Sequence, residues 1–258
     1  MARIRIACTA LITAAAVAGL GACQSKTDAK AGSADNASAS PSAGAGAQSS
    51  GATATDALAA VGKSTSGYRS VHMKAVSSIG TTRTTIDGKV AWNPLAEDVT
   101  TSVPGLGANG MHMLLSGTTA WAQVGGKWTK MDMSKMLGGG SSSSQDPASM
   151  VQLLVNTGDV KKVGQETVDG VSATHWAGTV DVQRMAARSS LPSGVKKMLD
   201  TAAQQGLRTE AVDLWADARD LPVRVHTSAQ TKQGAVVSTI DYTDYSTAPL
   251  KITPPAAG

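Results

Sequence analysis

The chain has 258 residues, a formal net charge of +4, no phenylalanine and two cysteines, Cys8 and Cys23. Its lysines and arginines are scattered singly or in pairs, which argues against a nucleic-acid partner, because such partners require clustered positive charge. Two cysteines near the N-terminus leave nothing for a disulfide framework or a thiolate metal site in the rest of the chain. The folded part of the protein must therefore depend on its apolar core.

The N-terminal segment has the pattern of a secretory signal. Arg3 and Arg5 precede an uncharged apolar run over residues 6–20, and small residues follow it. A basic start, an apolar centre and a small-residue cleavage site are typical of a signal peptide, and the run is shorter than the about 20 apolar residues of a lasting membrane span. Leu20-Gly21-Ala22-Cys23 resembles the bacterial lipobox, in which the cysteine thiol receives a diacylglyceryl group. We predict a lipoprotein signal peptide over 1–22 and lipidation of Cys23; the alternative is an ordinary signal peptide with a chance cysteine.

Residues 23–54 are predicted to form a disordered tether behind the lipidated cysteine. From residue 24 to residue 54 there is no Val, Ile, Leu, Met or aromatic side chain, so the segment cannot bury enough apolar surface to offset its ordering entropy. A flexible chain of this length would hold a domain on the order of 30 Å from the membrane surface.

A folded domain is predicted over residues 55–255. Asp56 is placed to N-cap a short helix over Ala57–Ser64. Beyond it, apolar and polar residues alternate, which favours antiparallel strands with one buried face. The alternation predicts strands over Tyr68–Ile79, Thr82–Trp92, Glu97–Val103, Met111–Leu115, Thr118–Val124, Lys127–Met131, Val160–Val168, Val171–Val182, Thr209–Ala216, Pro222–Thr231 and Ala235–Tyr245.

Helices and turns are marked by capping residues. Asp146-Pro147 is a helix start that Gly158 would end, and apolar residues at helical spacing over 191–203 predict a second helix before Gly206. Asp169-Gly170 is a hairpin dipeptide, and the Gly138–Ser144 run predicts a mobile loop. Neighbouring strands joined by short turns predict the α+β class: a single large curved antiparallel sheet with helices segregated to one side.

No catalytic or metal-binding constellation is visible in the sequence. The four histidines, His72, His112, His175 and His226, each lie within a predicted strand, and no pair has a metal-ligand spacing. We expect each to be a solvent-facing or hydrogen-bonded strand residue. No nucleophile elbow occurs, and the acids of the C-terminal strands have the spacing of a solvated face. The sequence therefore predicts a protein that is not an enzyme and that holds no cofactor and no metal.

Three stretches resemble a known family. They are Gly164–Asp181, Val212–Asp217 with the following Leu221–Val225, and Tyr242–Ser246. With the lipobox and the tether, they resemble actinobacterial lipoproteins of the LppX/LprG kind, which are similar in fold to the LolA and LolB carriers. Over about residues 56–255 the resemblance implies a LolA/LolB-like half-barrel with helices packed on its concave face. It also implies an apolar cavity that binds a lipid or glycolipid.

The functional hypothesis is a lipid-anchored protein on the extracytoplasmic face of the cell membrane that carries or presents the acylated molecule in the cell envelope. Methionine is flexible and suits a variable apolar surface, although it is equally a core filler in a chain without phenylalanine. The alternative function is a non-catalytic envelope sensor or scaffold that binds an envelope protein through the same fold. The residues predicted to line the cavity are Met73, Met111, Met113, Leu115, Met150, Leu154, Met198 and Leu199.

Overall fold

A computed structural model of the chain describes residues 51–105, 110–124, 126–134, 146–157, 159–187 and 193–255. The predicted signal peptide, Cys23, nearly all of the predicted tether and the Gly138–Ser144 loop lie outside the described residues. No helix in the described part is both long and apolar enough to cross a membrane.

The described elements are mostly strands, as the alternating pattern predicts. They follow in the order α1 (Gly51–Thr65), β1 (Ser70–Ile79), β2 (Thr82–Trp92), β3 (Leu95–Ser102), β4 (Met111–Ser116), β5 (Thr119–Val124), β6 (Lys127–Asp132), α3 (Pro147–Thr157), β7 (Lys161–Val168), β8 (Val171–Asp181), α4 (Val182–Ala186), α5 (Ser193–Gln204), β9 (Thr209–Ala216), β10 (Pro222–Thr231) and β11 (Gly234–Ser246).

All of these strands belong to one antiparallel sheet of eleven strands. Its order is β6-β5-β4-β3-β2-β1-β11-β10-β9-β8-β7. Each half is a meander of neighbouring hairpins, and the first and last strands pair with each other at the centre. Asp169 and Gly170 both have positive φ, 48° and 84°, which is the backbone of the tight hairpin turn predicted between β7 and β8.

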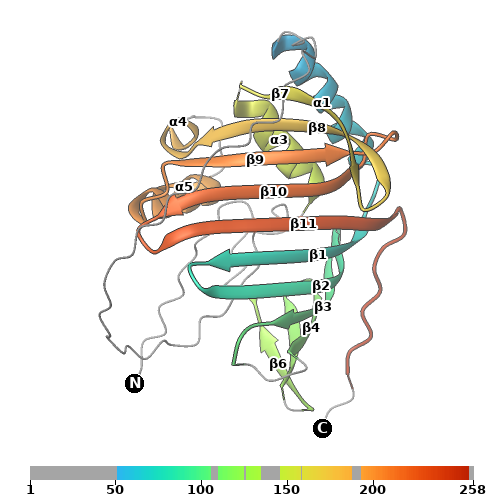
Figure 1. Cartoon of the computed structure of the whole chain (residues 1–258). Helices are drawn as coiled ribbons and strands as arrows, with labels where there is room; N and C mark the ends of the chain where they lie inside the picture. Colours follow the sequence, from blue (N-terminus) through green and yellow to red (C-terminus); the bar gives the residue numbers. More distant parts are fainter. Residues whose placement is uncertain are drawn as a thin grey trace, which may run out of the picture.

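The sheet curves around its helices (Figure 1). α1 and α3 pack against each other beside β7 and β8, and α4 and α5 pack against each other near the opposite ends of β8 and β9. Side chains on the concave face join those of the helices in one core that includes Leu58, Leu154, Trp176, Leu214 and Ile240. The predicted α+β class, with one large curved antiparallel half-barrel sheet and helices on its concave face, is confirmed.

Several element boundaries differ from the prediction by one or more residues, and two of the differences have a clear physical cause. α1 begins at Gly51, so Asp56 lies inside the helix and is not its N-cap. Ala54, Leu58 and Val61 recur at helical spacing and are all nearly fully buried, so packing extends the helix into the alanine-rich segment. β8 ends at Asp181, because its carboxylate accepts the amide N–H of Arg184 at 2.9 Å and caps the short helix α4.

Close packing between α3 and the sheet depends on a glycine. Gly178 faces inward on β8, and a Cβ there would lie 3.3 Å from both Leu154 Cδ2 on α3 and Val160 Cγ2. The missing side chain lets α3 approach the strand directly. As a result, Leu154 is completely buried.

Replacement of Gly88 by alanine should strongly destabilise the fold. Gly88 has φ +152°, and an added Cβ would lie 2.1 Å from the Asp98 carbonyl oxygen and 2.7 Å from Val99 Cα on the neighbouring strand. Since backbone atoms cannot rotate away, we expect Gly88→Ala to lower the free energy of unfolding by about 2 kcal/mol or more. The matched control is Gly164→Ala on β7, where the added Cβ meets nothing within 4 Å. Equal urea midpoints for the two variants would contradict this account.

Candidate functional site

The concave floor of the sheet is the candidate binding surface. Register places inward side chains in rows across the strands. One row runs from Tyr242 through Met73 and Gly88 to Val99 and Met113. Successive side chains of a strand point to opposite faces, so apolar residues at alternate sequence positions all lie on the concave face. The result is a largely apolar surface under the helices.

The structure brings most of the predicted lining residues together. Met73, Met150, Leu154 and Leu199 are buried in the common core, and Met113 packs against it. Met111 and Leu115 lie on the same face of β4 as Met113, two residues before and after it. Leu115 is buried and Met111 is half-buried. Met198 lies in α5, but its side chain is outside the described part. Lining of a cavity by these residues stays a prediction.

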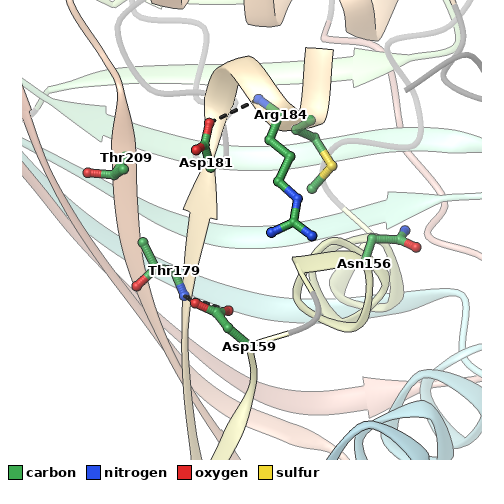
Figure 2. A pocket seen from close by; sticks show the side chains of 7 residues that line it. Asn156, Asp159, Thr179, Asp181, Arg184 and Thr209 are labelled. Carbon is green, nitrogen blue, oxygen red and sulfur yellow. Dashed lines mark hydrogen bonds between the residues drawn. The ribbon is translucent and has the colours of Figure 1, made fainter. Parts of the chain in front are cut away.

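One pocket of about 260 Å³ opens at the edge of the sheet (Figure 2). β7 pairs with β8 only as far as Ala177. The amide N–H of Thr179, which points toward the same edge of β8, therefore has no partner on β7. Both carboxylate oxygens of Asp159 accept this N–H, at 3.1 and 3.3 Å. The Arg184 side chain extends from α4 toward Asn156 across the pocket. Charged and polar side chains therefore share the lining of this pocket with Met185, and none of the eight predicted lining residues contributes to it.

A second pocket, of about 500 Å³, lies between α4 and α5. Short or polar side chains line it, and again none of the predicted lining residues is among them. Its lining residues are Gln183, Ala186, Ala187, Asp200, Ala203 and Gln204.

A row of polar side chains crosses the floor at the end nearest α4 and α5. Thr227 of β10 is paired in register with Ser238 of β11, Ser238 with Ser77 of β1, and Ser77 with Thr84 of β2. Glu210 of β9 lies diagonally beside Thr227, opposite Ala229. All of these residues except the half-buried Ser77 are at most 8% exposed. This row was not predicted from the sequence, although alternation with Val212 and Leu214 marks Glu210 as inward.

Glu210 is the most perturbed acid of the floor. It is 4% exposed, and its Oε2 atom has no hydrogen-bond partner in the described part of the protein. Burial raises the pKa of this carboxyl to about 7, while a hydrogen bond with Thr227 acts in the opposite direction. Near neutral pH the folded protein therefore holds a substantial fraction of Glu210 in its uncharged form.

The outer face of the sheet carries the histidines, each with a hydrogen-bonding partner. His112 Nε2 lies 2.7 Å from Asp98, His72 Nε2 lies 3.0 Å from Asp87, and His226 Nδ1 lies 3.0 Å from Thr239. The expectation of solvent-facing or hydrogen-bonded strand residues is confirmed for these three, and the following cluster confirms it for His175.

Residues from two of the three family-like stretches meet on that outer face. His175 Nδ1 lies 2.8 Å from Glu166 Oε1 and its Nε2 lies 2.8 Å from Asp213 Oδ1, while its ring stacks on Trp215 at a centroid distance of 4.3 Å. Trp215 donates its indole N–H to Glu166, and this bond together with His175 lowers the pKa of Glu166. Because both ring nitrogens are engaged, His175 has none free for a substrate or a metal ion. Trp176, the next residue, points into the core.

In the described part of the chain, no three His, Cys, Asp or Glu side chains form a group that could hold a metal ion. The absence of an enzymatic site stays a prediction from the sequence. The geometry that the structure does show is an apolar concave floor, a buried polar row and two small pockets at one end.

Solved structures share this architecture. LppX of Mycobacterium tuberculosis superposes with a TM-score of 0.55 at 18% identity over 79% of this chain and 100% of LppX. LprF of Mycobacterium bovis gives 0.53 at 19% identity over 83% of this chain and 100% of LprF. The chain has the LppX fold. The resemblance predicted from the strand and turn motifs is thereby confirmed at the level of the fold.

Curated sequence relatives of this LppX-like chain come from Streptomyces. An uncharacterized 31.2 kDa protein of Streptomyces griseus is 38% identical over 138 residues, 49% of this chain and 45% of the relative. A Streptomyces coelicolor protein named "Putative lipoprotein SCO4650" is 31% identical over 145 residues, 52% of this chain and 42% of the relative. The chain thus spans less than half the length of either relative. No family model matches it.

Replacement of Glu210 by glutamine should change how stability depends on pH. The carboxyl titrates near 4.5 in the unfolded chain and near 7 in the fold, so its ionisation disfavours the folded state increasingly from pH 4.5 to pH 7. The cost is absent below this window and complete above it, on the order of 3 kcal/mol. Relative to the wild type, Glu210→Gln should therefore gain stability as the pH rises from 4.5 to 8.

Urea unfolding at a series of pH values measures this difference. Glu166→Gln is the control: it removes an exposed carboxyl whose pKa is lowered, so it should not gain stability over the same pH range. Parallel stability profiles for wild type and Glu210→Gln would contradict the assignment.

Proposed function

We propose that this protein is a lipid-anchored extracytoplasmic lipoprotein that binds the acyl chains of a lipid or glycolipid and carries or presents it in the cell envelope. The observation that carries the proposal is the largely apolar floor of a curved sheet, covered by separate helices. Its likeness in fold to the lipoprotein LppX and to LprF, and a Streptomyces relative named as a putative lipoprotein, support the proposal.

The proposed mechanism is burial without a covalent step. Each methylene removed from water contributes about 0.8 kcal/mol. An acyl chain that moves from a bilayer to the concave floor exchanges one hydrocarbon environment for another, so this contribution is retained in both places. Loading and release can then be nearly balanced in free energy, as a carrier requires.

Methionines would make the floor adaptable. Met73 and Met150 are buried where the helices meet the sheet, and Met113 packs at the margin of the same core. An unbranched, polarizable side chain can change rotamer to follow a new neighbour. We propose that acyl chains enter between helices and floor by displacing such side chains, with the remaining predicted lining residues, Met111, Leu115, Leu154, Met198 and Leu199, extending the contact.

A charge placed on the floor should block lipid binding. Met113 faces inward and is only partly buried, so the Met113→Lys variant can fold with its ammonium group at the margin of the core. A bound acyl chain would then have to desolvate this charge, which disfavours binding. Full-length protein carrying Cys23→Ser is purified from cells without detergent, and mass spectrometry of solvent extracts counts acyl chains per protein. We expect at least about a tenfold loss in the Met113→Lys variant.

The matched control makes the same substitution on the opposite face of the same strand. His112→Lys points outward, beside Asp98, and should retain the lipid. Equal lipid content in the two variants would contradict binding on the floor. Lipid-free wild-type protein would contradict the carrier function and favour the sensor or scaffold hypothesis.

Removal of the lipidation site should release the protein from the membrane. Only a thiol at position 23 can form the thioether, so Cys23→Ser should move the full-length chain from the membrane fraction to the soluble fraction. Intact-mass measurement should show the loss of the diacylglyceryl group. Membrane retention of Cys23→Ser with an unchanged mass would contradict the anchor.

A further inference from the structure

The polar row on the floor is unusual because it is buried among apolar rows. The inward positions next to it across β9 to β1 are occupied by Val212, Val225, Ile240 and Ala75, all buried. Ser77 and Ser238 satisfy each other through a 2.9 Å hydroxyl contact. Buried polar groups are normally fully hydrogen-bonded, and the serine pair follows that rule.

Glu210 does not follow that rule. Its Oε2 atom is buried and has no donor within the described residues. Val180 and Ala229 are paired with Glu210 in register, and both are apolar. The side chain of Ala229 is a single methyl group, so it fills little of the space beside the carboxyl. An acceptor left without a partner in such surroundings is destabilising. Unless Oε2 itself carries the proton, the structure therefore presents an acceptor that lacks a donor.

The surroundings of Glu210 limit which chemical groups could donate a hydrogen bond to its Oε2 atom. Neighbouring side chains on the floor are apolar or carry hydroxyl groups, and no cation is paired with Glu210 in the described part of the chain. An anionic group such as a phosphate would be repelled by the ionised carboxylate, and it would bring a second charge into a buried, apolar site. An ammonium group would bring a second buried charge with its own desolvation cost. A neutral hydroxyl group fits best.

Space for a head group lies at this end of the molecule. Val182 N donates to Arg208 O at 2.9 Å, which ties the start of α4 to the residue directly before β9, the strand that carries Glu210. The pocket of about 500 Å³ between α4 and α5 is lined largely by alanines and exposed polar residues. Gln205, between α5 and β9, presents another buried acceptor, Oε1, that lacks a partner. Two unpartnered acceptors thus flank the same end of the floor.

We propose that Glu210, with Thr227 beside it, forms a hydrogen-bonding subsite for a neutral hydroxyl group of the bound lipid, whose O–H donates to Glu210 Oε2. This inference rests on the proposed lipid-binding function and deepens it: the cargo is a lipid with a free hydroxyl group near its acyl chains. A lipid whose hydroxyls are all esterified or etherified leaves Oε2 without its donor.

The test compares two probes that differ by one hydrogen-bond donor. They are 1,2-dioleoylglycerol and 1,2-dioleoyl-3-O-methylglycerol, each offered in phosphatidylcholine vesicles to the full-length chain carrying Cys23→Ser. Equilibrium partitioning of radiolabelled probe from vesicles to protein measures the affinity ratio. We expect the wild type to prefer the free hydroxyl by about tenfold.

Three variants separate the subsite from general lipid binding. Glu210→Leu should abolish the preference by weakening only the hydroxyl probe, whereas Glu210→Gln, which keeps an acceptor oxygen, should retain most of it. Glu166→Gln on the outer face should retain all of it. A wild-type ratio near one, or a tenfold preference that survives Glu210→Leu, would overturn the subsite while leaving lipid binding intact. Failure of both probes to bind the wild type would overturn the proposed function and the subsite together.

Discussion

The need to cover one face of a large curved sheet determines the rest of the structure. Alternation gives each strand an apolar side, and curvature turns these sides toward a common interior. α1, α3, α4 and α5 supply the cover, and they pack as two separate pairs instead of one continuous layer. The concave face is therefore covered by two separate helix pairs, whose side chains join those of the sheet in one core.

Polar groups on the two faces of the sheet differ in how completely they are hydrogen-bonded. On the outer face, Glu166, His175, Asp213 and Trp215 satisfy one another in a compact network. On the inner face, Glu210 keeps an unpartnered oxygen and a raised pKa. The outer network strengthens three adjacent strands at little cost, because its groups remain partly hydrated. The inner carboxyl reduces stability, and groups that do so commonly have a functional role.

Much of the fold could be predicted because its signals are local. Strands such as β9 and β10 show alternation within eight to ten residues, and Asp169-Gly170 identifies a hairpin without reference to the rest of the chain. The start of α1 could not be predicted in this way, since Ala54 is recruited into the helix by packing against distant residues. The order of the strands was equally inaccessible: nothing in the local pattern indicates that β1 and β11 are neighbours.

The candidate site was only partly predictable for a similar reason. Periodicity identifies Met73 and Met113 as inward, but not whether they line a space or fill a core. The polar row depends on register between five strands, so its continuity is a tertiary property. A search for polar residues at inward positions, such as Glu210 beside Val212, would have found its members individually. The two pockets depend on where the sheet edge and the short helix α4 end, which no motif indicates.

The pairing of β1 with β11 also has a consequence for the order of folding. The strand at the start of the domain obtains its central partner only from the last strand of the sheet, about 160 residues later. A growing chain that has emerged as far as β10 therefore consists of two open meanders with unprotected edges. Contacts of such long sequence separation form slowly, so the two halves of the sheet can join only after the C-terminal strand has been synthesised.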